Sequence, residues 1–261
     1  MQVRSLGFRT DLMLRQLGGA VVDDRGDHLV IRTPDNPWFY WGNFLLVPPL
    51  VPGDDRRWLD VFADTFPGAR HVAIGVDGTD GALEAGVAFH DAGLEPEINV
   101  VLTAAALRAP DTSPDGVELR PLSTDDDWQR SVAFRIEAGD TDDVAHREFA
   151  AARQAELRRQ AEAGHGVYVG AFVDGALAAE LGCYTGGDAL ARFQSVETAP
   201  AYRRRGLASA LMLLAEQLLR EQHTVEQLVI VADPSYVAID LYRRLGFVDA
   251  ERQVQWQRTP A

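Results

Sequence analysis

The C-terminal half of the chain shows the clearest periodic arrangement of hydrophobic and polar residues. Leucines recur at every third or fourth position within 207–218, so a helix there carries them on a single stripe. The segment 228–232 is continuously apolar, as expected for a central strand that is buried on both faces. Asp174-Gly175 separates two more apolar segments and is a strong signal for a two-residue hairpin turn. These patterns predict a sheet covered by helices.

The two halves of the chain share an order of predicted elements. In the C-terminal half we expect strands at 117–122, 167–173, 176–184, 192–198, 228–232 and 254–257, a helix start at 123–128, and helices at 145–163, after Gly206 and at 236–245. In the N-terminal half we expect strands at 38–47, 71–76 and 98–103, and helices at 57–66 and 81–92. The N-terminal order matches that of 192–257, which indicates an internal repeat and an α+β fold.

A segment rich in Pro, Asp, Ser and Gly, residues 108–116, separates the two halves and has no periodic pattern. We therefore expect an N-terminal domain at 1–110, a linker at 111–116 and a C-terminal domain at 117–261. Both domains have ordinary sizes.

Composition narrows the classes of function. With 46% hydrophobic and 25% charged residues, and no apolar run long enough to span a bilayer, the chain is typical of a globular protein without a membrane role. Cys183 is the only cysteine, and no secretory signal precedes the first strands, so we expect a cytoplasmic protein. A net charge of −14 without any lysine disfavours nucleic acid and mildly favours a cationic partner. An anionic ligand therefore requires a local positive site.

Residues 196–209 supply such a site. A strand ends near a proline, the loop carries Arg203, Arg204 and Arg205, and a helix opens at Gly206. A helix N-terminus offers unpaired N–H groups and partial positive charge to phosphate, and glycine lets the backbone approach it. The alternative is a solvated charge run beside an ordinary turn, but its place between a strand and an amphipathic helix favours a phosphate site.

The same residues resemble the acetyl-CoA motif of the GCN5-related N-acetyltransferase (GNAT) family, Arg/Gln-x-x-Gly-x-Gly/Ala, over 203–208. A later family pattern, Asn-x-x-Ala-x-x-Leu-Tyr-x-x-x-Gly-Phe, is matched over 235–247, with Ser235 in place of asparagine. Both motifs occur in order, so 117–261 as a whole resembles a GNAT domain. The resemblance implies a central mixed, mostly antiparallel sheet and acetyl-CoA as cosubstrate. The six histidines are scattered and Cys183 has no second cysteine beside it, so we expect no metal. The residues that the resemblance places at acetyl-CoA are Val196, Glu197, Thr198, Arg203, Arg204, Arg205, Gly206, Leu207, Ala208, Ser209, Ser235 and Tyr242.

Catalysis needs an acid for the leaving thiolate and a base for the amine. The resemblance assigns the acid to Tyr242, which shares a predicted helix face with Ser235; the alternative is a core aromatic residue. Some family members carry a glutamate where this chain has Ile230. Glu180 and Glu197 are candidate bases instead, although each also fits an ordinary salt-bridged carboxylate, and a water chain or an already neutral amine would serve equally.

The N-terminal half lacks the cofactor motif. Asp54 and Asp55 follow Gly53 where the C-terminal half has arginines, and we expect no glycine-opened helix there. Phe89 is at the position of the N-terminal half that corresponds to Tyr242 in the C-terminal half. The predicted strand 38–47 would place alternate residues of the aromatic run 38–41 on opposite sides, one pair in the core and one lining a cleft. We therefore predict a degenerate GNAT-like repeat that binds no coenzyme A.

These features predict an N-acetyltransferase that moves acetyl from acetyl-CoA to a primary amine of a small molecule or a peptide, acting as a monomer or homodimer. Two alternatives stay open. One is a non-catalytic acyl-CoA-binding or regulatory protein, and the other is an interaction scaffold.

Overall fold

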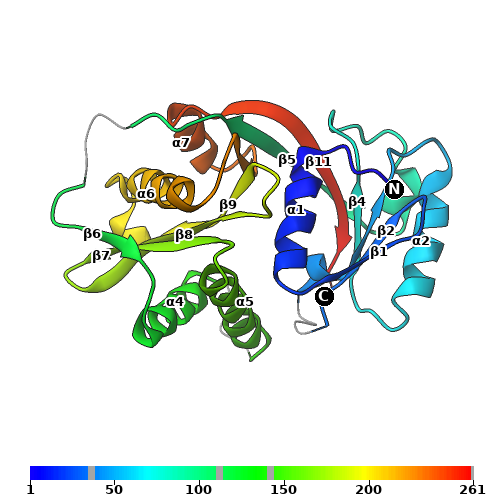
Figure 1. Cartoon of the computed structure of the whole chain (residues 1–261). Coiled ribbons are helices and arrows are strands. Elements are labelled where there is room, and N and C mark those ends of the chain that lie inside the picture. The colour runs from blue at the N-terminus through cyan, green and yellow to red at the C-terminus, as the bar shows by residue number, and fades with distance from the viewer. Residues whose placement is uncertain (35–38, 110–113, 140–143, 260–261) are drawn as a thin grey trace. The chain divides into compact units, whose positions relative to one another are not determined.

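The computed structural model describes residues 1–34, 39–109, 114–139 and 144–259. The chain forms two compact units (Figure 1). The first unit combines Met1–Val101 with Val231–Tyr236 and Asp249–Ala261, and the second combines Leu102–Ile230 with Val237–Val248. Among the described residues, no helix combines the length and apolar character that crossing a membrane requires.

The first unit is a sheet with helices on both faces. Its elements are α1 (Leu6–Leu17), β1 (Val21–Asp24), β2 (Leu29–Arg32), the short 3₁₀ helix η1 (Tyr40–Gly42), β3 (Phe44–Val47), α2 (Asp54–Thr65), β4 (Val72–Val76), α3 (Val87–Asp91), β5 (Glu95–Ala104) and β11 (Val248–Arg258). The strand order is β1-β2-β3-β4-β11-β5. Strands β3 and β4 are parallel, whereas β11 runs antiparallel to β4.

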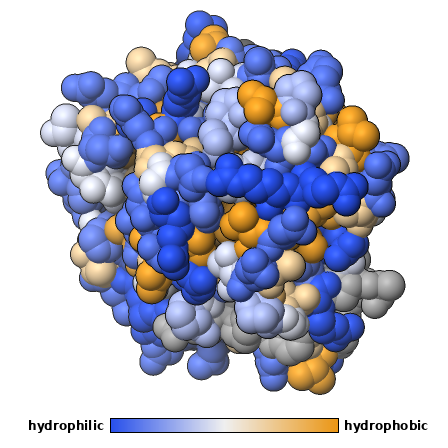
Figure 2. Space-filling view, turned by 90° about the vertical axis from the view of Figure 1, so that its right-hand side faces the viewer, coloured by the Kyte–Doolittle hydropathy of each residue, from blue (hydrophilic) through white to orange (hydrophobic). Residues whose placement is uncertain are grey.

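Alternation along β2 and β3 divides the core of the first unit into two clusters. Ile31 and Phe44 pack with Phe8 of α1, whereas Val30 and Leu45 pack with Trp58 of α2. Successive residues of a strand point to opposite faces, so these strands carry apolar residues at every position. Figure 2 shows a face of the molecule on which orange residues are scattered between hydrophilic ones.

The second unit has the same layered plan. Its elements are β6 (Glu118–Pro121), α4 (Asp125–Ala138), α5 (Val144–Glu162), β7 (Gly166–Val173), β8 (Ala176–Thr185), β9 (Leu190–Thr198), η2 (Pro200–Tyr202), α6 (Leu207–Gln222), β10 (Gln227–Ala232) and α7 (Ala238–Arg244). The strand order is β10-β9-β8-β7-β6. Helix α6 covers one face of β7 to β9, and α4 and α5 cover the other (Figure 1).

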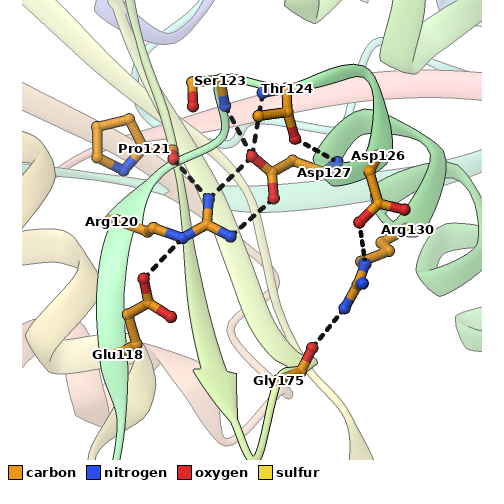
Figure 3. A network of polar contacts seen from close by, with 9 residues as sticks. All are labelled: Glu118, Arg120, Pro121, Ser123, Thr124, Asp126, Asp127, Arg130 and Gly175. Atoms are coloured by element: carbon orange, nitrogen blue, oxygen red, sulfur yellow. Dashed lines mark hydrogen bonds and ion pairs between the residues drawn. The ribbon is translucent and has the colours of Figure 1, made fainter.

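A polar network fixes the start of α4 (Figure 3). Thr124 and Asp127 form a reciprocal capping box, in which each side chain accepts a hydrogen bond from the backbone of the other residue. Arg120 donates to both carboxylate oxygens of Asp127, at 2.8 and 2.9 Å. This guanidinium and the nearby backbone N–H groups hold the pKa of Asp127 well below its usual range. Strand β6 is thereby tied to the helix that follows it.

Most of the predicted elements are present, including the hairpin, in which Asp174 and Gly175 have φ values of 50° and 79°. Two N-terminal predictions are wrong. Within 38–47 only Phe44–Val47 is a strand, so the expected alternation of the aromatic run does not apply; Trp38 lies outside the described residues. The helix expected at 81–92 is only Val87–Asp91, with Gly86 as its N-cap. Gly86 packs against Trp256, where a Cβ would lie 2.4 Å from the ring.

The grouping of the C-terminal strand differs from the expected domain boundaries. The prediction assigns 117–261 to one domain, whereas Asp249–Ala261 clusters with the first unit. The ladder between β11 and β4 runs from Val254↔Val76 to Arg258↔Val72. Residues at the end of the chain thus complete the N-terminal sheet. Part of the expected linker, residues 111–113, lies outside the described residues.

Candidate functional site

Strands β9 and β10 separate before β9 ends. Their parallel ladder runs only from Gln227↔Leu190 to Val229↔Arg192, whereas β9 continues to Thr198. On its other side, the pairing of β9 with β8 is irregular between Glu180 and Gly182, and Ser195 has a φ of 55°. This bulge bends β9. Within the described part of β9, the backbone after Arg192 therefore has an edge that β10 does not pair.

Helix α6 begins beside the end of β9. Its N-cap is Gly206, with φ 78° and ψ 4°, and no side chain caps the helix. A Cβ at this position meets nothing within 4 Å, so the left-handed backbone, and not crowding by the protein, accounts for the glycine. The first turn of α6 contains no acidic residue. Its N–H groups and the positive end of the helix dipole are therefore left for an anion.

The three arginines of the loop have different roles. Arg203 donates from Nε to the Thr198 carbonyl oxygen at 3.1 Å, which ties the loop to the end of β9. The Arg205 guanidinium lies 5.5 Å from the centre of the Tyr202 ring. Arg204 has a φ of 62°, a left-handed conformation that is uncommon outside glycine. All three side chains are exposed, so they are available to a phosphate ligand.

Tyr242 lies on α7 and is 5% exposed, with its ring 6.3 Å from that of Phe247. The predicted helix face shared with Ser235 is wrong, because α7 begins only at Ala238. The hydroxyl and the backbone N–H of Ser235 both donate to Asp233 Oδ1 at 2.7 Å. These bonds lower the pKa of Asp233. Ser235 is exposed and forms a local turn before the helix.

Glu180 is completely buried in the second unit. Its carboxylate accepts hydrogen bonds from Ser131 Oγ at 2.5 Å, Tyr168 Oη at 2.9 Å and Gln154 Nε2 at 3.1 Å. Burial raises the pKa of Glu180 to about 7, against the opposing effect of these donors and of Arg135. The surrounding side chains occupy both carboxyl oxygens, so Glu180 links β8 to α4, α5 and β7, and burial favours its protonated form below about pH 7.

Glu197 is directly opposite Glu180 on the neighbouring strand, so the two side chains share one face of the sheet. Like charges at such positions repel each other. Arg135 offsets this repulsion with Nη1 3.5 Å from Glu197 Oε2, and Arg203 approaches the other oxygen at 3.9 Å. Unlike Glu180, the Glu197 side chain is 27% exposed. Its two ion pairs are long, so an incoming cation has room to compete for the carboxylate.

The partners of Glu180 are not evident in the sequence. Ser131, Gln154 and Tyr168 come from α4, α5 and β7, and no local motif joins them. Ser131 and Gln154 are also polar, so the periodic pattern of apolar residues does not indicate that they are buried. The described residues contain no group of three or more His, Cys, Asp or Glu side chains arranged to bind a metal.

The family comparison agrees with this geometry. Residues 126–247 match the model of the acetyltransferase (GNAT) family. This segment belongs to the GNAT family. The matched segment contains the bulged strand β9, the Gly206 helix start and Tyr242. No curated protein sequence matches the chain.

Solved structures share the fold over nearly the whole chain. A functionally unknown conserved protein from Staphylococcus epidermidis ATCC 12228 has a TM-score of 0.70 at 11% identity, covering 92% of this chain and 93% of that one. A GCN5-related N-acetyltransferase from Kribbella flavida has a TM-score of 0.66 at 19% identity, covering 98% and 97%. A tandem GNAT protein from the clavulanic acid biosynthesis pathway has a TM-score of 0.56 at 15% identity, covering 95% and 88%. The α+β GNAT fold is therefore confirmed.

Proposed function

We propose that the chain is an N-acetyltransferase that moves acetyl from acetyl-CoA to a primary amine of a small molecule or a peptide. The observation that carries this proposal is the start of α6. Gly206 opens an uncapped helix N-terminus, free of acidic residues, next to the unpaired edge of β9. That arrangement fits a ligand that has a pyrophosphate at one end and amide groups along its arm.

The residues present fit acetyl-CoA in two places. The N–H groups of 204–209 would hold the pyrophosphate, with Arg204 and Arg205 adding charge-assisted bonds. Backbone groups of 196–198 would pair with the pantetheine amides where β10 has separated from β9. Acetyl-CoA supplies the activated acyl group, and the protein supplies orientation and proton transfer.

Proton transfer is assigned to two residues of the second unit. Tyr242 would donate its phenolic proton to the departing sulfur as the carbon–sulfur bond breaks. Glu197, which is the more exposed of the two candidate carboxylates, would take the proton that the amine nitrogen loses as the new carbon–nitrogen bond forms. Glu180 would act as a positioning residue, because its charge and that of Glu197 share Arg135.

The net charge of −14 mildly favours a cationic acceptor. In this proposal the first unit, with Asp54 and Asp55 at the matching helix start, binds no coenzyme A. The alternative function is a non-catalytic acyl-CoA-binding or regulatory protein, which the buried position of Glu180 favours because that carboxylate cannot reach an acceptor directly.

Release of coenzyme A from acetyl-CoA in the presence of a panel of primary amines tests the proposal. Turnover with at least one amine, and none without an amine, is expected. Tight binding of coenzyme A without turnover on any amine would instead favour the non-catalytic alternative. Absence of coenzyme A binding would contradict both.

A further inference from the structure

The first unit has a pocket of its own. Its volume is about 440 Å³, and the residues that matter for its chemistry are Thr33, Tyr40, Asn43, Phe66, Arg70 and His71. This size suits a small organic molecule. The pocket lies at the end of α2 and the start of β4, so it is remote in the fold from the Gly53 helix start. Nothing in the proposed acetyl transfer uses it.

Aromatic rings form much of the wall. The Tyr40 and His71 rings stack with their centres 4.7 Å apart and an angle of 17° between their planes. Phe66 also lines the pocket and carries the Arg32 guanidinium 5.3 Å from its ring centre. Flat walls of this kind favour a planar ring, which packs against them with offset or edge contacts.

His71 lines the pocket and has one ring nitrogen engaged in a hydrogen bond with the backbone. His71 is only 7% exposed, and its Nε2 lies 2.9 Å from the Asn43 carbonyl oxygen. A carbonyl oxygen only accepts, so Nε2 carries the hydrogen, and in the neutral ring Nδ1 is an acceptor. None of the described residues donates to Nδ1. A ligand with a hydroxyl or N–H group would satisfy it.

Arg70 supplies a positive charge at the same pocket. It is exposed, and among the described residues it pairs with no carboxylate, although the chain has 39 acidic and 25 basic residues. Arg32 lies over the Phe66 ring but lines a neighbouring pocket together with Asp64, so Arg70 is the cation of this site. An exposed arginine without an acidic partner among the described residues makes the mouth of the pocket locally attractive to an anion.

We propose that this pocket binds a small planar aromatic acid that carries a hydroxyl or N–H group. The ring packs against Tyr40 and Phe66, the carboxylate pairs with Arg70 at the mouth, and the donor group bonds His71 Nδ1 inside. Such a site gives the N-terminal unit a ligand of its own. It stands independently of the proposed acetyl transfer.

The test uses 3- and 4-hydroxybenzoate as probes with the full chain, followed by NMR of ¹⁵N-labelled histidine. We expect binding at millimolar concentrations or tighter, with a change in the His71 Nδ1 resonance. Loss of a charge-assisted contact costs about 10- to 100-fold in affinity, so Arg70→Gln and the neutral probe 4-hydroxybenzamide should each show that loss. Benzoate, which lacks the donor, should bind up to about tenfold more weakly.

Arg56→Gln is the matched control, because Arg56 is an exposed arginine of the same unit that does not line the pocket. It should leave probe affinity unchanged. Equal affinity for hydroxybenzoate and hydroxybenzamide, or wild-type affinity in Arg70→Gln, would overturn the assignment of the acid. An unchanged His71 resonance at saturation, or no binding by either hydroxybenzoate, would overturn the site itself.

Discussion

The N-termini of α2 and α6 have the same backbone conformation, but the residues that follow differ in charge. Gly53 is the N-cap of α2 with φ 92° and ψ −7°, and Gly206 is the N-cap of α6 with φ 78° and ψ 4°. A Cβ on either glycine meets nothing within 4 Å. The expectation that the N-terminal half has no glycine-opened helix is therefore wrong. Both units build the same kind of helix start.

The residues that follow decide what each helix start does. Asp54 and Asp55 occupy the first turn of α2, where negative charge already balances the helix dipole. Asp55 is 4% exposed and accepts from Ala88 N at 2.5 Å and from Arg56 N at 3.0 Å. It thus joins the start of α2 to α3. In α6 the first turn has no acid, so its positive end is left for a ligand. Backbone geometry alone does not make an anion site.

The sharpest contrast between the units is expected at Tyr242 and Phe89. Tyr242→Phe keeps the buried ring and removes the proposed acid, so turnover should fall by about 10²- to 10⁴-fold, with little change in acetyl-CoA affinity. Phe89→Tyr is the matched control, since Phe89 is buried in the first unit and should not affect turnover. Single-turnover kinetics measures the effect. Unchanged chemistry in Tyr242→Phe would make the hydroxyl structural.

The buried carboxyl group of Glu180 should make the free energy of unfolding depend on pH. The pKa of Glu180 is raised from 4.5 to about 7 in the folded chain. Between these values the unfolded chain releases this proton and the folded chain keeps it, so the free energy of unfolding falls as pH rises, by about 3 kcal/mol in total. Below pH 4.5 and above pH 7 the contribution is constant.

Glu180→Gln removes that contribution. Denaturant unfolding of both proteins from pH 4 to pH 8 should show the stability difference between them changing between about pH 4.5 and pH 7, in favour of the variant at higher pH. The positioning role predicts, in addition, a shifted pH profile of turnover at near-normal acetyl-CoA affinity. Parallel stability curves would contradict the raised pKa.

The third contrast tests the two helix starts directly. Gly206→Glu adds negative charge and forces a Cβ into a left-handed conformation, so acetyl-CoA affinity should fall by at least about tenfold. Gly206→Asn, which tolerates that conformation, should lose much less. Gly53→Glu makes the same change in the first unit and should leave affinity unchanged. Calorimetry on folded variants measures the acetyl-CoA affinity. Equal losses of affinity for substitutions at both glycines would remove the distinction between the units.

Local signals in the sequence were enough for the fold class, the Asp174-Gly175 hairpin and the loop before α6, because each depends on neighbouring residues. Only the structure shows the features that depend on contacts between residues far apart in the sequence. Nothing near Glu180 indicated Ser131 or Gln154, and nothing near Val254 indicated that β11 pairs with β4. The acidic residues after Gly53 argue against a phosphate site but do not prevent a helix from starting there, because backbone conformation and charge are separate properties.

The smallest expected effect concerns Asp55, the residue that separates the two helix starts chemically. Asp55→Ala leaves the Ala88 N–H without its acceptor, so the free energy of unfolding should fall by about 1–3 kcal/mol. Asp55→Asn retains an oxygen acceptor and should lose less. Because Asp54 remains and no arginine loop precedes α2, neither variant should gain coenzyme A binding, and each should still bind one coenzyme A per chain. Denaturant unfolding measures the stability, and calorimetry the stoichiometry. A second bound coenzyme A in Asp55→Ala would show that this one carboxylate is all that closes the N-terminal helix start to phosphate.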